Sequence, residues 1–198
     1  MSEFPPPRRP EPAAQMPVRQ MLGLQLGIVL LALVLGMIFR IDLLADLEIS
    51  LAALNLSGAG TATLLLGVWT LNTRRWGWVV ELKTFMRETL VPLFRHAPPG
   101  TLFLVALLAG VGEELLFRGV IQGGLDGVLG PWPALVLASI LFGAMHALSK
   151  AYFVLATVMG FYMGLIYLWT GNLLIPILIH FLYDWIVLRY YVDAHENA

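Results

Sequence analysis

Six long apolar segments make up most of this chain and decide what it can fold into. They cover residues 22–39, 49–71, 101–122, 132–148, 151–170 and 172–189. A helix needs about 20 apolar residues to cross a bilayer. Each segment is close to that length, so the sequence predicts an all-α, polytopic membrane helical bundle of about six transmembrane helices.

The composition also indicates a membrane protein. Of the 198 residues, 59% are apolar and 13% are charged, whereas a soluble domain usually has about 25% charged residues. The chain has no cysteine, which excludes disulfides, thiolate metal sites and a cysteine nucleophile. We expect the lipid bilayer as its surroundings and no nucleic-acid partner.

Four regions are expected along the chain. Residues 1–20 are polar and Pro-rich and predict a disordered cytoplasmic tail. Residues 21–99 hold two transmembrane helices and a stretch after Trp76 in which apolar and basic side chains alternate, which is typical of an amphipathic helix in the membrane interface. Residues 100–190 hold four spans and form the expected catalytic core. Residues 191–198 form a second tail.

The charges outside the spans predict the orientation. With the N-terminus inside, 10 of the 12 Lys and Arg residues fall in inner segments. The loops on the other side hold Asp42, Asp46, Glu48 and Asp126. This asymmetry follows the positive-inside rule. We therefore expect a multi-pass protein with both termini in the cytoplasm, in a prokaryotic plasma membrane because the chain is short.

The ionisable side chains within the spans fall into three short clusters. These are Glu113-Glu114-Leu115-Leu116-Phe117-Arg118, Phe142-Gly143-Ala144-Met145-His146 and His180-Phe181-Leu182-Tyr183-Asp184. A charge at the bilayer centre costs at least ~2.5–3.5 kcal/mol on insertion scales. We expect the clusters to face one another and to form a reactive site.

Helical spacing separates the two carboxylates of the first cluster. Glu114 and Arg118 are four residues apart, so they share a helix face and can form an ion pair. Glu113 points about 100° away around the helix, which leaves its carboxylate free to act as a general base that deprotonates water. His180 and Asp184 again have the i, i+4 spacing, so the carboxylate can orient the imidazole ring.

Structural readings of the same residues remain open at this stage. An intramembrane histidine such as His146 often only bonds a neighbouring helix. The Glu114–Arg118 pair often serves packing alone. His180 and Asp184 are also the kind of pair that relays protons in a transporter.

The three clusters, in this order and on successive helices, resemble the motifs of the CPBP family of intramembrane proteases. The family groups CAAX prenyl endopeptidases of the Rce1 type with bacteriocin-processing and immunity proteins. Its pattern is E-E-x-x-x-R, then F-x-x-x-H, then H-x-x-x-N or H-x-x-x-D. The resemblance covers roughly residues 100–190.

The resemblance implies a role for each matching residue. Glu113 would activate water with the help of His146, and Glu114 with Arg118 would support the site. His180 and Asp184 would stabilise the oxyanion. The implied activity is endoproteolysis of a membrane-associated peptide or protein, which would be the partner of this chain.

Asp184 stands where the family often has asparagine, and an ionised carboxylate cannot donate a hydrogen bond. Asp184 is therefore protonated, or holds a charged His180 that donates instead, or binds a metal. We favour the second possibility. No cofactor is required in this reading, although zinc is possible, with Glu113, His146, His180 and Asp184 as its candidate ligands.

Two other functions would use the same clusters. One is a non-catalytic bacteriocin-immunity or binding protein of the same fold. The other is a small proton-coupled transporter, although the sequence shows no internal repeat of the kind many transporters have.

Overall fold

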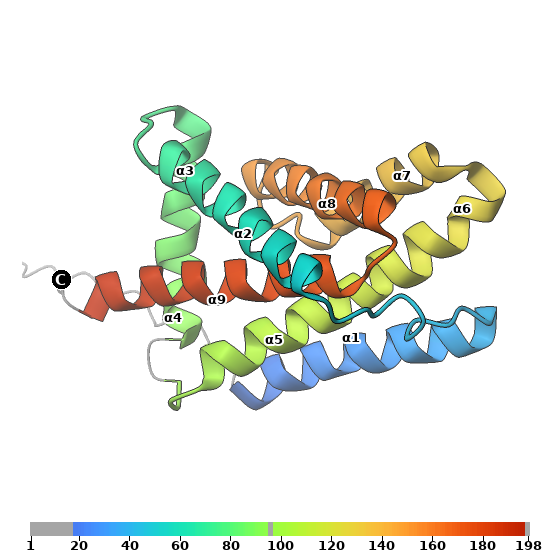
Figure 1. The fold of residues 1–198 in the computed structure, drawn as a ribbon. Coiled ribbons are helices and arrows are strands. Elements are labelled where there is room, and N and C mark those ends of the chain that lie inside the picture. Colours follow the sequence, from blue (N-terminus) through green and yellow to red (C-terminus); the bar gives the residue numbers. More distant parts are fainter. Residues whose placement is uncertain (1–17, 95–96, 197–198) are drawn as a thin grey trace, which may run out of the picture.

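A computed structural model of the chain describes residues 18–94 and 97–196 (Figure 1). The described residues form helices joined by short turns and include no strand, which confirms the predicted all-α membrane bundle. Residues 1–17 of the expected N-terminal tail lie outside this description. The helices and π-helical segments are α1 (Val18–Phe39), α2 (Leu51–Asn72), α3 (Gly77–Phe85), η1 (Met86–Leu90), α4 (Val91–Phe94), α5 (Thr101–Glu114), η2 (Leu115–Gly123), α6 (Gly124–Leu129), α7 (Pro131–Met145), α8 (Lys150–Thr170) and α9 (Leu174–Glu196).

Four of the described helices are long and apolar enough to cross a membrane. They are Val18–Phe39, Leu51–Asn72, Lys150–Thr170 and Leu174–Ala194. Large apolar side chains such as Leu24, Leu54 and Trp69 stay exposed on them, as expected of surfaces that contact lipid.

The other two expected spans differ from regular transmembrane helices. The segment predicted at 101–122 is helical throughout, but its hydrogen bonding changes from α to π at Leu115. The segment predicted at 132–148 is α7, which has 15 residues and ends at Met145. A helix of that length spans about 22 Å, less than the ~30 Å hydrocarbon core.

The first and last helices, α1 and α9, extend beyond the bounds that the sequence predicted. α1 begins at Val18 because Met21 is buried against Phe94 and Val192, which holds its first turn. α9 continues through residues expected as a tail. Arg189 Nε donates a 2.7 Å hydrogen bond to Asp193 one turn later, which supports this extension.

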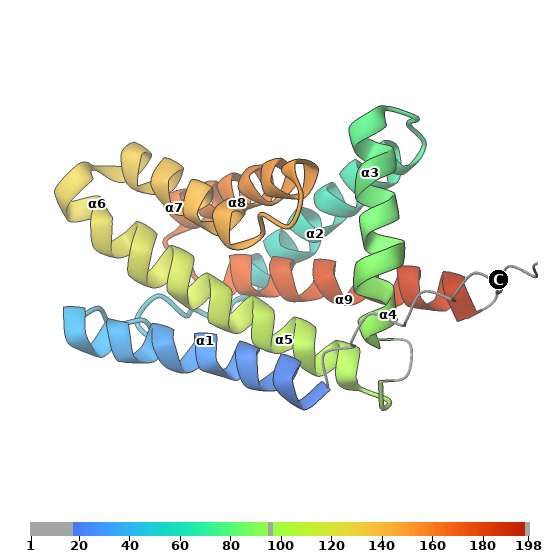
Figure 2. The ribbon, with the colours of Figure 1, turned by 180° about the vertical axis from the view of Figure 1, so that it is seen from behind.

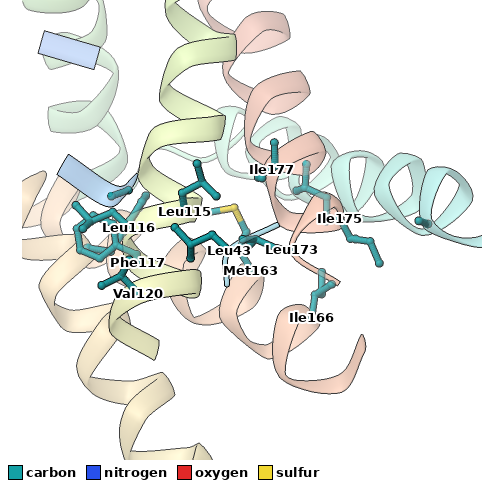
Figure 3. Close-up of a cluster of buried hydrophobic side chains, with 14 of the residues drawn as sticks. Leu43, Leu115, Leu116, Phe117, Val120, Met163, Ile166, Leu173, Ile175 and Ile177 are labelled. Atoms are coloured by element: carbon teal, nitrogen blue, oxygen red, sulfur yellow. The ribbon is translucent and has the colours of Figure 1, made fainter. Parts of the chain in front are cut away.

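Helix packing places the three motif-bearing segments around one centre. α1 lies beside α5 in both views of the fold, and the α3–η1–α4 run crosses α9 (Figures 1 and 2). α5 also packs on α9, while α7 pairs with α8. A cluster of buried side chains that includes Leu43, Leu115, Met163 and Leu173 fills the space between η2, α8 and α9 (Figure 3).

Two loops meet at one end of the bundle. Tyr167 donates to Asp46 at 2.6 Å, and Asn172 donates to the Glu48 carbonyl at 2.8 Å. Gly171 ends α8 with a φ of 62°, a conformation that favours glycine. The α1–α2 loop and the α8–α9 turn therefore lie on the same side, as the predicted topology requires.

Candidate active site

Close helix contacts bring the first and third clusters together. A Cβ atom on Gly110 of α5 would lie 2.9 Å from the backbone nitrogen of Phe181 on α9. Only a glycine allows this approach, in the way that small residues do in membrane bundles. The contact lies one turn before Glu114 on α5 and next to His180 on α9. The two carboxylate-bearing helices therefore meet at the level of the site.

Glu114 is the centre of a buried polar network. Its Oε2 lies 3.1 Å from Arg118 Nε, and its Oε1 accepts from Arg118 Nη1 at 3.2 Å. The guanidinium also donates to the Gly160 carbonyl and lies over the Phe142 ring, 4.8 Å from its centroid. Glu114 and Arg118 are both 0% exposed, so each charge depends on the other for compensation.

His180 is held between two carboxylates. Its Nδ1 donates to Glu114 Oε1 at 2.8 Å, and its Nε2 lies 3.4 Å from Asp184 Oδ2. Two carboxylates on opposite sides of the ring favour the imidazolium form, which has an N–H on each nitrogen. Both i, i+4 pairs expected from the sequence are present, and the contact between Glu114 and His180 joins them.

Glu113 and His146 form a second, looser pair. His146 Nδ1 lies 2.8 Å from the Phe142 carbonyl, so Nδ1–H donates there and the unprotonated Nε2 is left as an acceptor in the neutral ring. The Phe142 ring packs against the imidazole, with the ring centroids 4.6 Å apart. Nε2 lies 3.6 Å from Glu113 Oε2, which is beyond direct hydrogen-bond range. That carboxylate oxygen is buried and has no partner among the described residues.

One cavity of about 350 Å³ is lined by the four candidate reactive residues, Glu113, His146, His180 and Asp184. Most of the remaining lining is apolar and comes from α1, α2, α5, α8, α9 and the α3–η1–α4 run. The exposed fractions of the His146 and Asp184 side chains are 20% and 31%, against 5% for Glu113. The cavity can therefore admit an apolar chain to a buried carboxylate.

These side chains do not fit a zinc site. Both nitrogens of His180 face carboxylates, and Nδ1 of His146 faces a backbone carbonyl. Of the four ring nitrogens of these two histidines, only His146 Nε2 keeps a lone pair for a metal. Within the described part of the chain, no three His, Asp or Glu residues are grouped so that they could hold an ion. We therefore derive no step through a metal.

The sequence did not point to two polar residues of the cavity wall. Gln25 of α1 lines it, and its buried Oε1 has no partner among the described residues. Tyr152 of α8 lines it beside His146, with the ring centroids 5.7 Å apart. Neither residue belongs to a recognisable motif. The only local signal is Ser149, which caps α8 and fixes the turn that carries Tyr152.

Comparisons with known proteins agree with the motifs. Residues 95–186 match the family model described as type II CAAX prenyl endopeptidase Rce1-like, which confirms the predicted family. The chain is similar to the uncharacterized protein YpbD of Bacillus subtilis (strain 168), with 43% identity over 93 residues. That alignment covers 46% of this chain and 44% of the relative. No solved structure matches the chain.

Proposed function

We propose that the chain is an intramembrane endopeptidase, because residues 95–186 match the model of the Rce1-like type II CAAX prenyl endopeptidases. Its substrate is a membrane-associated peptide or protein. The observation that carries the proposal is the buried Glu113 Oε2, which faces His146 Nε2 across 3.6 Å at the cavity wall. A water molecule between the two groups can bond to both of them.

The first step is attack of water on the scissile carbonyl. Glu113 takes one proton from the water as its oxygen bonds to the carbonyl carbon. His146 orients the water through Nε2, because its Nδ1–H is committed to the Phe142 carbonyl at 2.8 Å. The carbonyl π electrons move to the oxygen, which becomes an oxyanion.

His180 stabilises that oxyanion. Its Nε2 lies 3.4 Å from Asp184 Oδ2, a long contact that leaves the N–H able to bond to the oxyanion. Glu114 on one side of the ring and Asp184 on the other stabilise the positive charge of the imidazolium. In the second step the oxyanion electrons re-form the C=O bond, Glu113 returns its proton to the leaving nitrogen, and the C–N bond breaks. One water is consumed, and the products are a carboxylic acid and an amine, which become a carboxylate and an ammonium group when the acid proton passes to the amine.

The Glu114–Arg118 pair positions these groups and does not touch the substrate. Glu114 orients His180 through Oε1, while Arg118 compensates its charge. A buried carboxylate with two cationic partners keeps its position, so His180 keeps its orientation towards the cavity.

Protein-terminus proteomics tests the proposal. Cells with the wild-type chain are compared with cells that carry Glu113→Gln, at matched expression. Glu81→Gln is the matched control, because Glu81 lies on the exposed surface of α3 and outside the cavity. New termini should occur with wild type and Glu81→Gln and disappear with Glu113→Gln.

Identical termini in all three strains would contradict the proposal. If Glu113→Gln also kept a cellular phenotype of the wild type, the non-catalytic binding or immunity function would replace it. A proton flux in proteoliposomes that requires His180 and Asp184 would instead favour the transporter.

A further inference from the structure

The proposed reaction leaves its oxyanion short of hydrogen-bond donors. His180 Nδ1–H is bound to Glu114 at 2.8 Å, so only Nε2–H is available, and it is shared with Asp184. Asp184 accepts bonds as a carboxylate and does not donate. Each hydrogen-bond donor aimed at an oxyanion raises kcat by about 10²–10³-fold. A second donor near His180 would therefore increase the rate substantially.

Tyr152 presents an O–H group in the same cavity. Its side chain lines the wall together with Glu113, His146 and Asp184. Its ring contacts the His146 imidazole, with the ring centroids 5.7 Å apart, so Tyr152 lies on the side of the cavity where His146 and Glu113 would hold the water. None of the hydrogen bonds found among the described residues uses the Tyr152 hydroxyl, so the hydroxyl is free to donate into the cavity.

The Tyr152 ring is fixed by its surroundings. Ser149 accepts a 3.1 Å bond from the Tyr152 backbone nitrogen and caps the first turn of α8. The His146 ring meets the phenol ring edge-on, with the centroids 5.7 Å apart. Phe85 of α3 also packs on the phenol ring, with the centroids 5.3 Å apart. A group held in this way pays little entropy when it binds the reacting atoms.

We propose that Tyr152 is a catalytic residue whose hydroxyl donates the second hydrogen bond to the oxyanion; this inference rests on the proposed function. The phenol proton is not transferred. The hydrogen bond from the Tyr152 hydroxyl to the carbonyl oxygen shortens as negative charge develops on that oxygen. The bond lengthens again when the C–N bond breaks. Glu113 alone carries the proton that moves from water to the leaving nitrogen.

Tyr183 is the competing phenol. It lines the same cavity. Among the ring contacts of the described residues, the one between a phenol and His146 is made by Tyr152, with centroids 5.7 Å apart, and Tyr183 has no such contact with the group that would hold the water. The structure therefore assigns the role to Tyr152.

The test compares three Tyr→Phe variants in liposomes. The probe is a fluorophore–quencher peptide copied from the most abundant cleavage site that depends on Glu113 in cells. The variants are Tyr152→Phe, Tyr183→Phe and, as a neutral control, Tyr190→Phe, whose side chain is 58% exposed. Each removes one hydroxyl and keeps the ring, so folding is preserved, and thermal unfolding in detergent checks this.

We expect Tyr152→Phe to lower kcat by about 10²–10³-fold with KM unchanged, because the bond forms only as the oxyanion develops. Tyr190→Phe should match the wild type. Wild-type kcat in Tyr152→Phe, or a rise in KM alone, would overturn the inference while leaving the proposed function intact. A kcat loss in Tyr183→Phe without one in Tyr152→Phe would also overturn it. The absence of any Glu113-dependent termini would overturn both proposals.

Discussion

Glu114 contacts two cationic groups from different helices, Arg118 on η2 and His180 on α9. A carboxylate with 0% exposure requires such compensation, because the desolvation of an unpaired charge costs several kcal/mol. The neighbouring Glu113 is nearly as buried, and its ion-pair contact within the described chain is with His146 at 3.6 Å. Two adjacent residues of one type thus have different surroundings: Glu114 is held by two cationic groups, and Glu113 keeps a buried oxygen without a partner among the described residues.

Removal of one member of the buried pair should destabilise the protein strongly. Arg118→Met leaves Glu114 without its main counter-charge, and we expect a loss of about 3–5 kcal/mol in the free energy of unfolding. The double variant Glu114→Gln/Arg118→Met should recover part of that loss, since no charge is stranded. Thermal and chemical unfolding in detergent measures both. Equal stability of the single and double variants would argue against a mutual dependence of the charges.

Substitution of Asp184 tests how the proposed oxyanion is stabilised. Its contact with His180 Nε2 is 3.4 Å, and the side chain is 31% exposed. Asp184→Asn keeps the shape and can still bond to the ring or donate an N–H to the oxyanion, so we expect substantial activity to remain. Peptide cleavage in liposomes is the measurement. A complete loss of cleavage, accompanied by loss of a bound ion, would instead favour a metal ligand at this position.

Treatment with a chelator addresses the same question independently. Because three of the four ring nitrogens in the site face carboxylates or a carbonyl, we expect EDTA or 1,10-phenanthroline to leave the cleavage rate unchanged. Added zinc should not raise the rate. A rate that falls with the chelator and returns with zinc would show that the groups rearrange around a metal.

At the scale of the helices, the site depends on the contact between α5 and α9. Gly110 allows the two backbones to approach, and His180 then reaches Glu114 at 2.8 Å. The π-helical geometry of η2 begins directly after Glu114 and continues past Arg118. π segments within helices are frequent at functional sites, and this one shifts the register of the residues that follow the two carboxylates.

Gly110→Ala should separate the two helices and disable the site. The added methyl group would lie 2.9 Å from a backbone nitrogen, so the helices must move apart. We expect lower thermal stability and a loss of peptide cleavage. Gly67→Ala on α2 is the matched control, because its Cβ meets nothing within 4 Å and alanine favours the helix by up to ~1 kcal/mol. Similar losses in both variants would contradict a specific role for the Gly110 contact.

The sequence predicted the i, i+4 pairs of the site and that the three clusters face one another, but not every contact between residues of different clusters. Helical periodicity alone linked Glu114 to Arg118 and His180 to Asp184, and both pairs are present. Periodicity carries no information about partners 66 residues apart, so the contact between Glu114 and His180 was not foreseen. Tyr152 was missed for the same reason, since its place in the cavity depends on how α7 turns into α8.

At the scale of the whole molecule, the helices predicted from hydropathy are present, but two of the six expected spans are irregular. Hydropathy measures only the length of an apolar run, so it did not reveal the π segment after Glu114 or the early end of α7. It also gave no sign that α1 and the α3–η1–α4 run line the cavity. These elements lie outside the three motifs and complete the site through packing.

The orientation of the protein can be tested with reporter fusions. The α1–α2 loop and the α8–α9 turn meet at one end, where Tyr167 bonds to Asp46. Reporters fused after Asp46 and after Asp126 should give the signal of an external location, because the basic residues favour the cytoplasmic side. An internal signal at either fusion would contradict a topology with both termini in the cytoplasm.

The central claim is that Glu113 activates the water that cleaves a peptide bond. The most direct measurement is the cleavage rate of purified wild type and Glu113→Gln in liposomes, on a peptide copied from the cleaved cellular site, with peptide binding measured in parallel. We predict that Glu113→Gln lowers kcat by about 10²–10⁴-fold and leaves peptide binding unchanged. A rate within twofold of wild type would contradict the claim and remove Glu113 from the mechanism.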